Sequence, residues 1–186
     1  TATDTVVDPN LGFPLEIEAG SVNQAPSAVI DTAGLDIDVT SDGGDVTLAG
    51  PVLAREIVIG PAAAADARPG DVTVADARVG TGGGPTVFTV LQPQGAVALT
   101  GDGAMTIRQI QHIDTVGAVT LVAAGDLTLE GFLEGTAIAI TATGDVIAQP
   151  PAGSASDSII AESLSIEAGG TIDIGAFDLA DRIDGR

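Results

Sequence analysis

The sequence contains no cysteine, tryptophan, tyrosine or lysine, and it has a single histidine. Without cysteine, the chain of 186 residues can form neither a disulfide framework nor a thiolate metal site. All six basic residues are arginine, against 26 acidic residues, and the net charge is −20. A surface of this charge repels phosphate backbones and anionic lipid headgroups. We therefore expect no nucleic-acid binding and no membrane insertion.

The acidity most simply serves solubility, with adaptation to high salt or binding of divalent cations as the alternatives. The sequence also lacks an initiator methionine, a signal-peptide pattern and any run of 18 apolar residues. These features predict a chain that is processed or that is part of something longer.

Apolar residues make up 45% of the chain, and nearly all of them are valine, isoleucine, leucine or alanine. Short runs rich in β-branched residues alternate with clusters of glycine, aspartate and threonine, which is the pattern of strands joined by tight turns. Helical periodicity is nearly absent. Only residues 62–68 and 177–183 are predicted as short helices.

A degenerate unit recurs along the chain, and it consists of an alternating strand, a Gly/Asp turn and a second alternating strand. Its clearest copies are residues 35–50, 118–131, 137–148 and 163–175. Weaker copies are 56–77 and 96–110, and 15–22 resembles a damaged first copy. The copies follow one another at intervals of roughly 20 to 30 residues, the period of solenoid coils. Loops inserted at 61–69 and 150–158 are expected to account for the longer intervals.

The unit predicts an all-β chain folded as a right-handed parallel β-helix, or β-solenoid, of about seven irregular coils. The coils are expected over residues 35–176, between an N-terminal segment, 1–34, that could include a first coil and a C-terminal segment, 177–186. Alternation of side chains gives each strand one dry face. The first apolar residue after each turn should therefore point into one core; these residues are Val46, Val72, Leu127, Val146 and Ile172.

The phrases GGDVTLAG, AAGDLTLEG, TATGDVIA and EAGGTIDIG resemble the repeats of filamentous-haemagglutinin-type exoproteins and related giant bacterial adhesins. The resemblance covers roughly residues 35–175. It implies a parallel β-helix, export across the bacterial envelope to the cell surface, and a role in adhesion or in a surface fibre. It also implies a receptor or glycan partner of unknown identity.

The ends of a β-solenoid expose unpaired backbone groups and an apolar cross-section. We therefore expect end-to-end stacking, either with further coils of the same chain or with other subunits.

No catalytic, cofactor or metal-binding residues are predicted, and the chain is not expected to be an enzyme. His112 lies close to Asp114 in the sequence, but we expect a surface or corner histidine rather than a catalytic pair. No serine lies in a nucleophile elbow. The run at residues 80–85 is rich in glycine, but no Lys-Ser/Thr pair follows it, so it predicts an excursion from the coil rather than a phosphate loop.

Two carboxylate pairs are each expected on one face of a strand: Glu16 with Glu18, and Asp36 with Asp38. Such pairs leave open an alternative function as a carbohydrate-active β-helix, either a polysaccharide lyase or a tailspike-like protein. The chain is poor in the basic and aromatic residues that bind sugars, which favours the structural reading.

No cofactor is expected, and calcium is the one ion for which the turns offer ligands. Asp42 with Asp45, and Asp102 between two glycines, place carboxylates in such turns. The GGxGxD repeat of calcium β-rolls is absent, so solvated turn aspartates are favoured. A binder of a flat solid such as ice or a mineral should show a threonine ladder. Only the segment 141–143 approaches this pattern.

Overall fold

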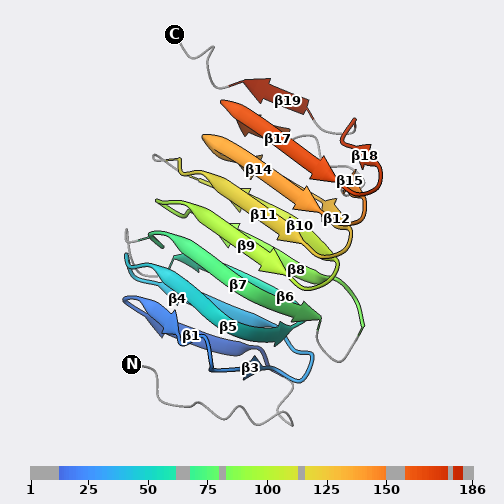
Figure 1. Ribbon diagram of the computed structural model, residues 1–186. Helices are drawn as coiled ribbons and strands as arrows, with labels where there is room; N and C mark the ends of the chain where they lie inside the picture. The colour runs from blue at the N-terminus through green and yellow to red at the C-terminus, as the bar shows by residue number, and fades with distance from the viewer. Residues whose placement is uncertain are drawn as a thin grey trace.

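The computed structural model describes residues 13–61, 68–79, 83–112, 116–149, 158–175 and 178–181. Within these ranges the chain forms strands and turns and no helix. The strands lie in successive rungs from the N-terminal to the C-terminal end of the molecule (Figure 1). Paired strands always run parallel, and they belong to two sheets, which we name sheet A and sheet B.

Sheet A contains, in stacking order, β1 (Leu15–Ala19), β4 (Ile37–Ser41), β6 (Glu56–Pro61), β8 (Thr86–Leu91), β10 (Met105–Gln111), β12 (Leu127–Leu129), β15 (Val146–Ala148) and β18 (Ile172–Asp173). Sheet B contains β2 (Val22–Gln24), β5 (Val46–Ala54), β7 (Val72–Val79), β9 (Val97–Gly101), β11 (Val119–Ala123), β14 (Ala137–Ala142) and β17 (Ser163–Ala168). Off these paths, β3 (Ile30–Asp31) pairs with β5, and β13 (Leu133–Glu134), β16 (Ser158–Ala161) and β19 (Asp178–Asp181) extend the second half of β10.

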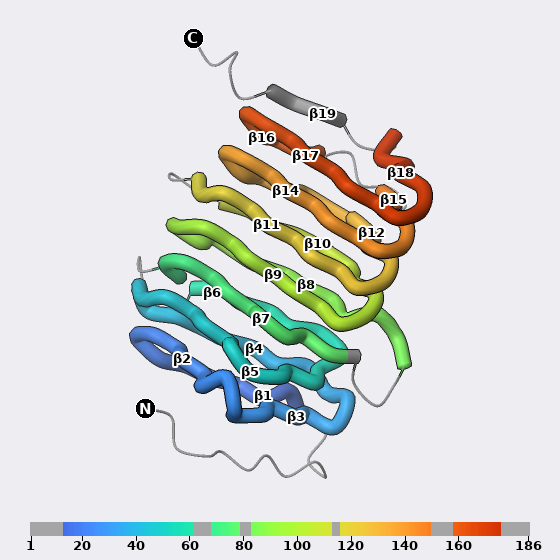
Figure 2. The backbone as a smooth tube through the Cα atoms, viewed as in Figure 1, coloured from blue at the N-terminus to red at the C-terminus, as the bar shows by residue number. Residues whose placement is uncertain are grey.

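This arrangement is a parallel β-solenoid of about six turns, close to the seven coils expected, and it confirms the predicted fold class. The chain crosses from one sheet to the other at two corners (Figure 2). Strands that follow one another along the chain therefore lie in opposite sheets, and each strand pairs with a strand of the next coil. We name these the A-to-B corner and the B-to-A corner after the direction of the chain.

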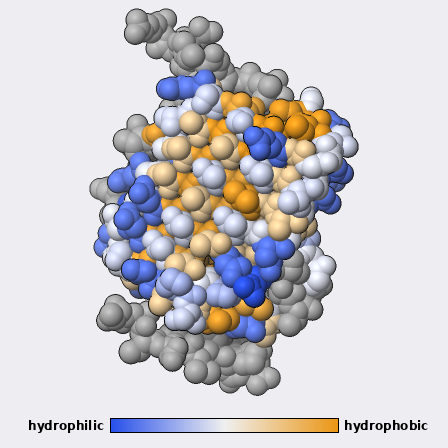
Figure 3. Space-filling view, viewed as in Figure 1, coloured by the Kyte–Doolittle hydropathy of each residue, from blue (hydrophilic) through white to orange (hydrophobic). Residues whose placement is uncertain are grey.

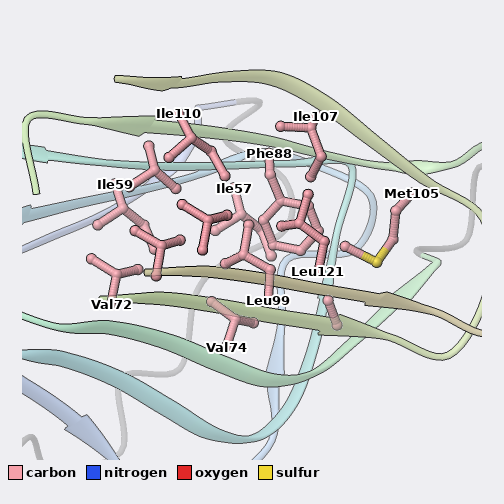
Figure 4. Close-up of a cluster of buried hydrophobic side chains, with 14 of the residues drawn as sticks. Ile57, Ile59, Val72, Val74, Phe88, Leu99, Met105, Ile107, Ile110 and Leu121 are labelled. Atoms are coloured by element: carbon pink, nitrogen blue, oxygen red, sulfur yellow. The ribbon is translucent and has the colours of Figure 1, made fainter. Parts of the chain in front are cut away.

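The core lies between the two sheets, because every second side chain of each strand points inward. Strand β5 alternates between buried and partly exposed residues along its whole length. Residues at the same register position in successive coils form columns, such as Ile57, Phe88 and Ile107. These three side chains are at most 1% exposed and lie against others from both sheets (Figure 4). Burial of one such side chain contributes about 1.5–3 kcal/mol.

Four of the five residues expected in the core are confirmed there, since Val46, Val72, Leu127 and Val146 are fully buried. They belong to two columns on opposite sheets, because Val46 pairs with Val72 in sheet B and Leu127 pairs with Val146 in sheet A. Ile172 continues the second column but is 48% exposed. Within the described residues no strand pairs with the outer edge of β18.

The repeat itself is present, but its copies fall into two sets. The first three copies, at 15–22, 35–50 and 56–77, surround the A-to-B corner, and the last four surround the B-to-A corner. In the copies 56–77 and 96–110 the first apolar residues after the turn are Val72 and Met105, and 105 − 72 gives an interval of 33 residues. Val72 is aligned with Val97 of β9, whereas Met105 lies in the opposite sheet. The long interval from Val72 to Met105 therefore spans more than one coil. An inserted loop is the wrong explanation for it, since strand β8 was not recognised as part of a repeat.

The helix predicted at residues 177–183 is wrong over the described residues, because 178–181 form strand β19, which pairs with β16. Backbone pairing with the sheet edge outweighs the weak local helical preference here. Residues 62–67, most of the other predicted helix, lie outside the described residues. Strands β1 and β2 add a coil before residue 35.

Candidate functional surfaces

Aspartates at the corners bind the backbone of the next coil. At the A-to-B corner, Asp45 Oδ1 accepts a hydrogen bond from the N–H of Asp71 at 2.9 Å. Asp71 Oδ1 accepts in the same way from the N–H of Ala96 at 2.8 Å. Hydrogen bonds to a carboxylate are stronger than those between neutral groups. These side chains therefore add a link between successive coils at the corner, beside backbone hydrogen bonds such as that from the Gly70 N–H to the Gly44 carbonyl oxygen.

The B-to-A corner repeats this arrangement in the C-terminal half. Asp126 Oδ1 accepts from the N–H of Asp145 at 2.9 Å, and Asp145 Oδ1 accepts from the N–H of Thr171 at 2.6 Å. A glycine precedes each residue that donates this N–H, and it leaves room for the carboxylate. A Cβ on Gly144 would lie 2.0 Å from Asp126 Oδ1, and one on Gly170 would lie 2.1 Å from Asp145 Oδ1. The recurring Gly-Asp pair is thus a stacking device. From the sequence alone this pair predicts only a turn.

The turn carboxylates considered for calcium do not converge on a common point. Asp45 binds the backbone of the next coil, and Asp102 lies 3.8 Å from the Arg78 guanidinium. The side chain of Asp42 is exposed. Across the ranges that the structure describes, no group of three or more histidine, aspartate or glutamate side chains could hold a metal ion.

Three arginines link carboxylates of neighbouring strands and coils. Each guanidinium-bearing side chain is at least 46% exposed, so solvent screens these ion pairs and they contribute little to stability. The hydrogen bond from Arg78 lowers the pKa of Asp76. The pairs are Arg55 with Asp36, Arg78 with Asp76 and Asp102, and Arg108 with Glu56 and Glu130.

The two predicted carboxylate pairs lie together on the outer face of sheet A. Glu16 is aligned with Asp38 of the next coil, and Glu18 with a threonine. Burial raises the pKa of Asp38, and the charges of Asp36, Glu16 and Glu56 raise it further. Asp36 itself receives two hydrogen bonds from Arg55, at 2.8 and 2.6 Å. The cluster is therefore a site of like-charge repulsion that favours binding of a proton by Asp38.

His112 lies at the A-to-B corner and is 3% exposed, so it is a corner histidine that is buried rather than on the surface. Its Nδ1 lies 2.9 Å from the carbonyl oxygen of Glu134, and its Nε2 lies 3.1 Å from that of Gly95. Both partners are acceptors from other coils, and a neutral ring can donate to only one of them at a time. Asp114 lies outside the described residues.

The outer face of sheet B differs from that of sheet A in charge. We define the sheet-B face as the outward side chains of β9, β11 and β14. Every one of them is alanine, threonine or valine, and none carries a charge. Thr120 lies beside Ala98 and Ala139, so the threonines alternate with alanines and do not form an unbroken ladder. The face comprises Ala98, Thr100, Thr120, Val122, Ala137, Ala139 and Thr141.

The C-terminal end of the stack leaves two core columns open. Leu164 of β17 is 36% exposed, whereas its partner Ile138 in the coil beneath is 2% exposed. Ile172 and Val146 show the same contrast, at 48% and 0%. Within the described part of the chain, β17 pairs only with β14. This end therefore presents both an apolar cross-section and a free strand edge.

No family model, curated protein or solved structure matches the chain. No helix in the described ranges is long and apolar enough to cross a membrane.

Proposed function

We propose that the chain is a non-catalytic structural or adhesive segment of a longer bacterial surface fibre, in which its coils stack on further coils. The observation that carries this proposal is the open C-terminal end, where Leu164 and Ile172 occupy core columns but remain 36% and 48% exposed. In the interior, the same positions become buried because the next coil covers them.

The N-terminal end holds the first position of the same column, and Val22 there is 8% exposed. Val22 of β2 begins the column that Leu164 ends, and all paired strands in the stack run parallel. A second copy placed above the C-terminal end could therefore continue the column without a change in strand direction. This contact between copies would bury the side chains of Leu164 and Ile172, and full burial of each contributes about 1.5–3 kcal/mol. It would also provide a hydrogen-bonding partner for the free edge of β17. Such a head-to-tail contact does not close on itself, so it generates a rod.

The surface location and the adhesive role in this proposal come from the resemblance of the repeats to those of bacterial adhesins. The alternative carbohydrate-active function has less support. The Asp145 carboxylate accepts a hydrogen bond from the backbone of the next coil, and the Asp36 carboxylate accepts one from Arg55. The only histidine is buried between two carbonyl oxygens. None of these groups is left available to a sugar.

Sedimentation velocity of the purified chain over a range of concentrations, at moderate salt, tests the stacking. We expect concentration-dependent association that Leu164→Lys abolishes. Ser165→Lys is the matched control, since it adds the same charge to the same strand but at the outward position next to Leu164. A monomer at every concentration, with β17 amides as protected from hydrogen exchange as those of β11, would overturn the proposal.

A further inference from the structure

The sheet-B face is unusual in a chain with a net charge of −20. Its seven side chains are uncharged, and valine is the largest of them. Figure 3 shows this side of the molecule with tan, orange and near-white atoms over its middle and many of the blue ones at the left margin. The corner carboxylates and those of sheet A lie outside the face, and the strands that flank it carry the nearest charges of sheet B, which are Glu167 of β17 and Asp76 and Arg78 of β7. The three strands of the face thus form a neutral window in an acidic surface.

The face is also regular. Strand β11 pairs with β9 and with β14 over five residues each, without a register shift. The shifts in sheet B lie on β5 and β7, closer to the N-terminal end. Unshifted strands place their outward side chains about 4.8 Å apart across strands and about 6.7 Å apart along them. The result is a flat grid of methyl and hydroxyl groups.

A grid of small side chains provides none of the large aromatic or arginine anchors on which most protein interfaces depend. It also provides no aromatic platform for a sugar and no charge for a lipid or an ion. The partner that this face suits must be flat, uncharged and of the same period. The sheet-B face of another copy meets all three conditions.

We infer that the sheet-B faces of two copies of this chain pack against each other, related by a two-fold axis through β11. Two copies of charge −20 repel each other, and a lateral contact through a face without charges adds the least to that repulsion. Face-to-face sheets pack about 10 Å apart, close to the screening length of about 8 Å at physiological salt. The lateral contact is independent of the axial stacking proposed above, because it uses the flank of the solenoid rather than its end.

The size of the face sets the strength of the contact. Its three strands span about 15 Å by 20 Å, so pairing buries roughly 600 Å² in total. Stable interfaces bury about 1,200–2,000 Å². One pair of segments should thus associate weakly. In a rod of many coils the contact repeats, and the rods bundle by multivalency.

The chain has no cysteine, so a single introduced thiol reports the contact directly. The variant Thr120→Cys places it at the centre of the face, where a residue near a two-fold axis approaches its own copy. The matched control Thr128→Cys places it on the outer face of sheet A. Both variants carry Leu164→Lys to block axial stacking. At high protein concentration and moderate salt under mild oxidation, we expect a disulfide-linked dimer at least fivefold more abundant for Thr120→Cys than for the control.

A second pair of variants separates pairing from a general change in charge. Thr120→Lys and Thr128→Lys alter the net charge equally, and only the first should abolish dimers in sedimentation. Equal cross-linking of the two cysteine variants would overturn the inference. The inference would also be overturned if the chain inhibited the growth of ice crystals and gave no cross-linked dimer. That result would mean that the sheet-B face binds ice instead of a second copy.

Discussion

The interior coils and the last coil of the solenoid are built from the same kind of sequence, yet they are buried to different extents. Val146 and Ile172 are paired in one column and are 0% and 48% exposed. Ile138 and Leu164 are paired in another, and are 2% and 36% exposed. A coil of this chain therefore does not bury its own apolar face. Its neighbours do, so the stability of a coil depends on what lies above and below it.

The largest expected effect comes from placing a charge in an interior column. Ile140 is 1% exposed and is aligned with Ile166 of the last coil, which is only partly buried. Ile140→Asp should lower the free energy of unfolding by at least 3 kcal/mol, because an unpaired carboxylate would be buried there. Ile166→Asp should lower it by less than half as much. Denaturant titration of both variants measures the difference.

Thr141→Asp is the control for these two variants, since Thr141 is the exposed outward neighbour of Ile140. It should change stability by about 0.5 kcal/mol or less. Equal losses for Ile140→Asp and Ile166→Asp would contradict the view that stacking, rather than local sequence, determines burial.

The next effect in size concerns the glycines of the corners. A Cβ on Gly144 would lie 2.0 Å from Asp126 Oδ1 of the coil beneath, whereas one on Gly20, in the first coil, would meet nothing within 4 Å. Gly144→Ala should therefore cost about 1–3 kcal/mol through overpacking, and Gly20→Ala should be close to neutral. Thermal unfolding of the two variants measures both. A destabilising Gly20→Ala would show that the first coil is packed like an interior one.

A smaller effect is expected from the carboxylate that ties the last coil to the stack. Asp145→Ala removes the acceptor for the N–H of Thr171, and should cost about 1 kcal/mol. The loss should be local, with faster hydrogen exchange at the Thr171 amide and unchanged exchange in β11. Asp102→Ala is the control, because in the described structure this turn carboxylate contacts only the exposed Arg78. It should leave the Thr171 amide protected from exchange. Unchanged exchange at Thr171 in the first variant would disprove the stacking role of Asp145.

Much of this fold could be predicted from sequence because the physical signals are local. Alternation along 35–40 and the Gly-Asp turns predicted parallel coils with an apolar interior, and the structure confirms them. What the pattern could not show is which of the two corners a given copy surrounds, since both corners carry the same signature. Val72 and Met105 were equated for that reason, although they lie in opposite sheets.

The stacking role of the aspartates was missed for a related reason. Whether Asp45 is solvated or binds Asp71 depends on a residue in another coil, 26 positions away. Its signal was Gly70, which precedes the residue that donates the N–H, because a Cβ there would lie 2.3 Å from Asp45 Oδ1. Similarly, the burial of His112 depends on carbonyl oxygens of two other coils, which no local pattern specifies.

The smallest expected effect concerns Asp38, which lies between the first coil and the third on the outer face of sheet A. Its pKa is raised by burial first and then by Asp36, Glu16 and Glu56. In the pH window between its unfolded value, about 3.9, and this raised pKa, the folded state binds more protons than the unfolded state. The stability of the protein should therefore fall as the pH rises through that window, and the full penalty should persist at neutral pH.

Asp38→Asn removes this penalty, so we expect it to stabilise the protein at pH 7 by about 0.5 kcal/mol or less. The advantage should shrink as the pH is lowered through the raised pKa, because the wild-type carboxyl then becomes neutral as well. Glu18→Gln removes the same charge from the adjacent strand of the first coil, at a position that does not contribute to the pKa of Asp38. Its stability relative to wild type should therefore lack this pH dependence. Melting temperatures of the three proteins between pH 3 and pH 8 provide the measurement. An Asp38→Asn variant less stable than wild type at pH 7 would mean that the ionised carboxylate is stabilised in the stack, and that the outer face of sheet A holds its charges without repulsion.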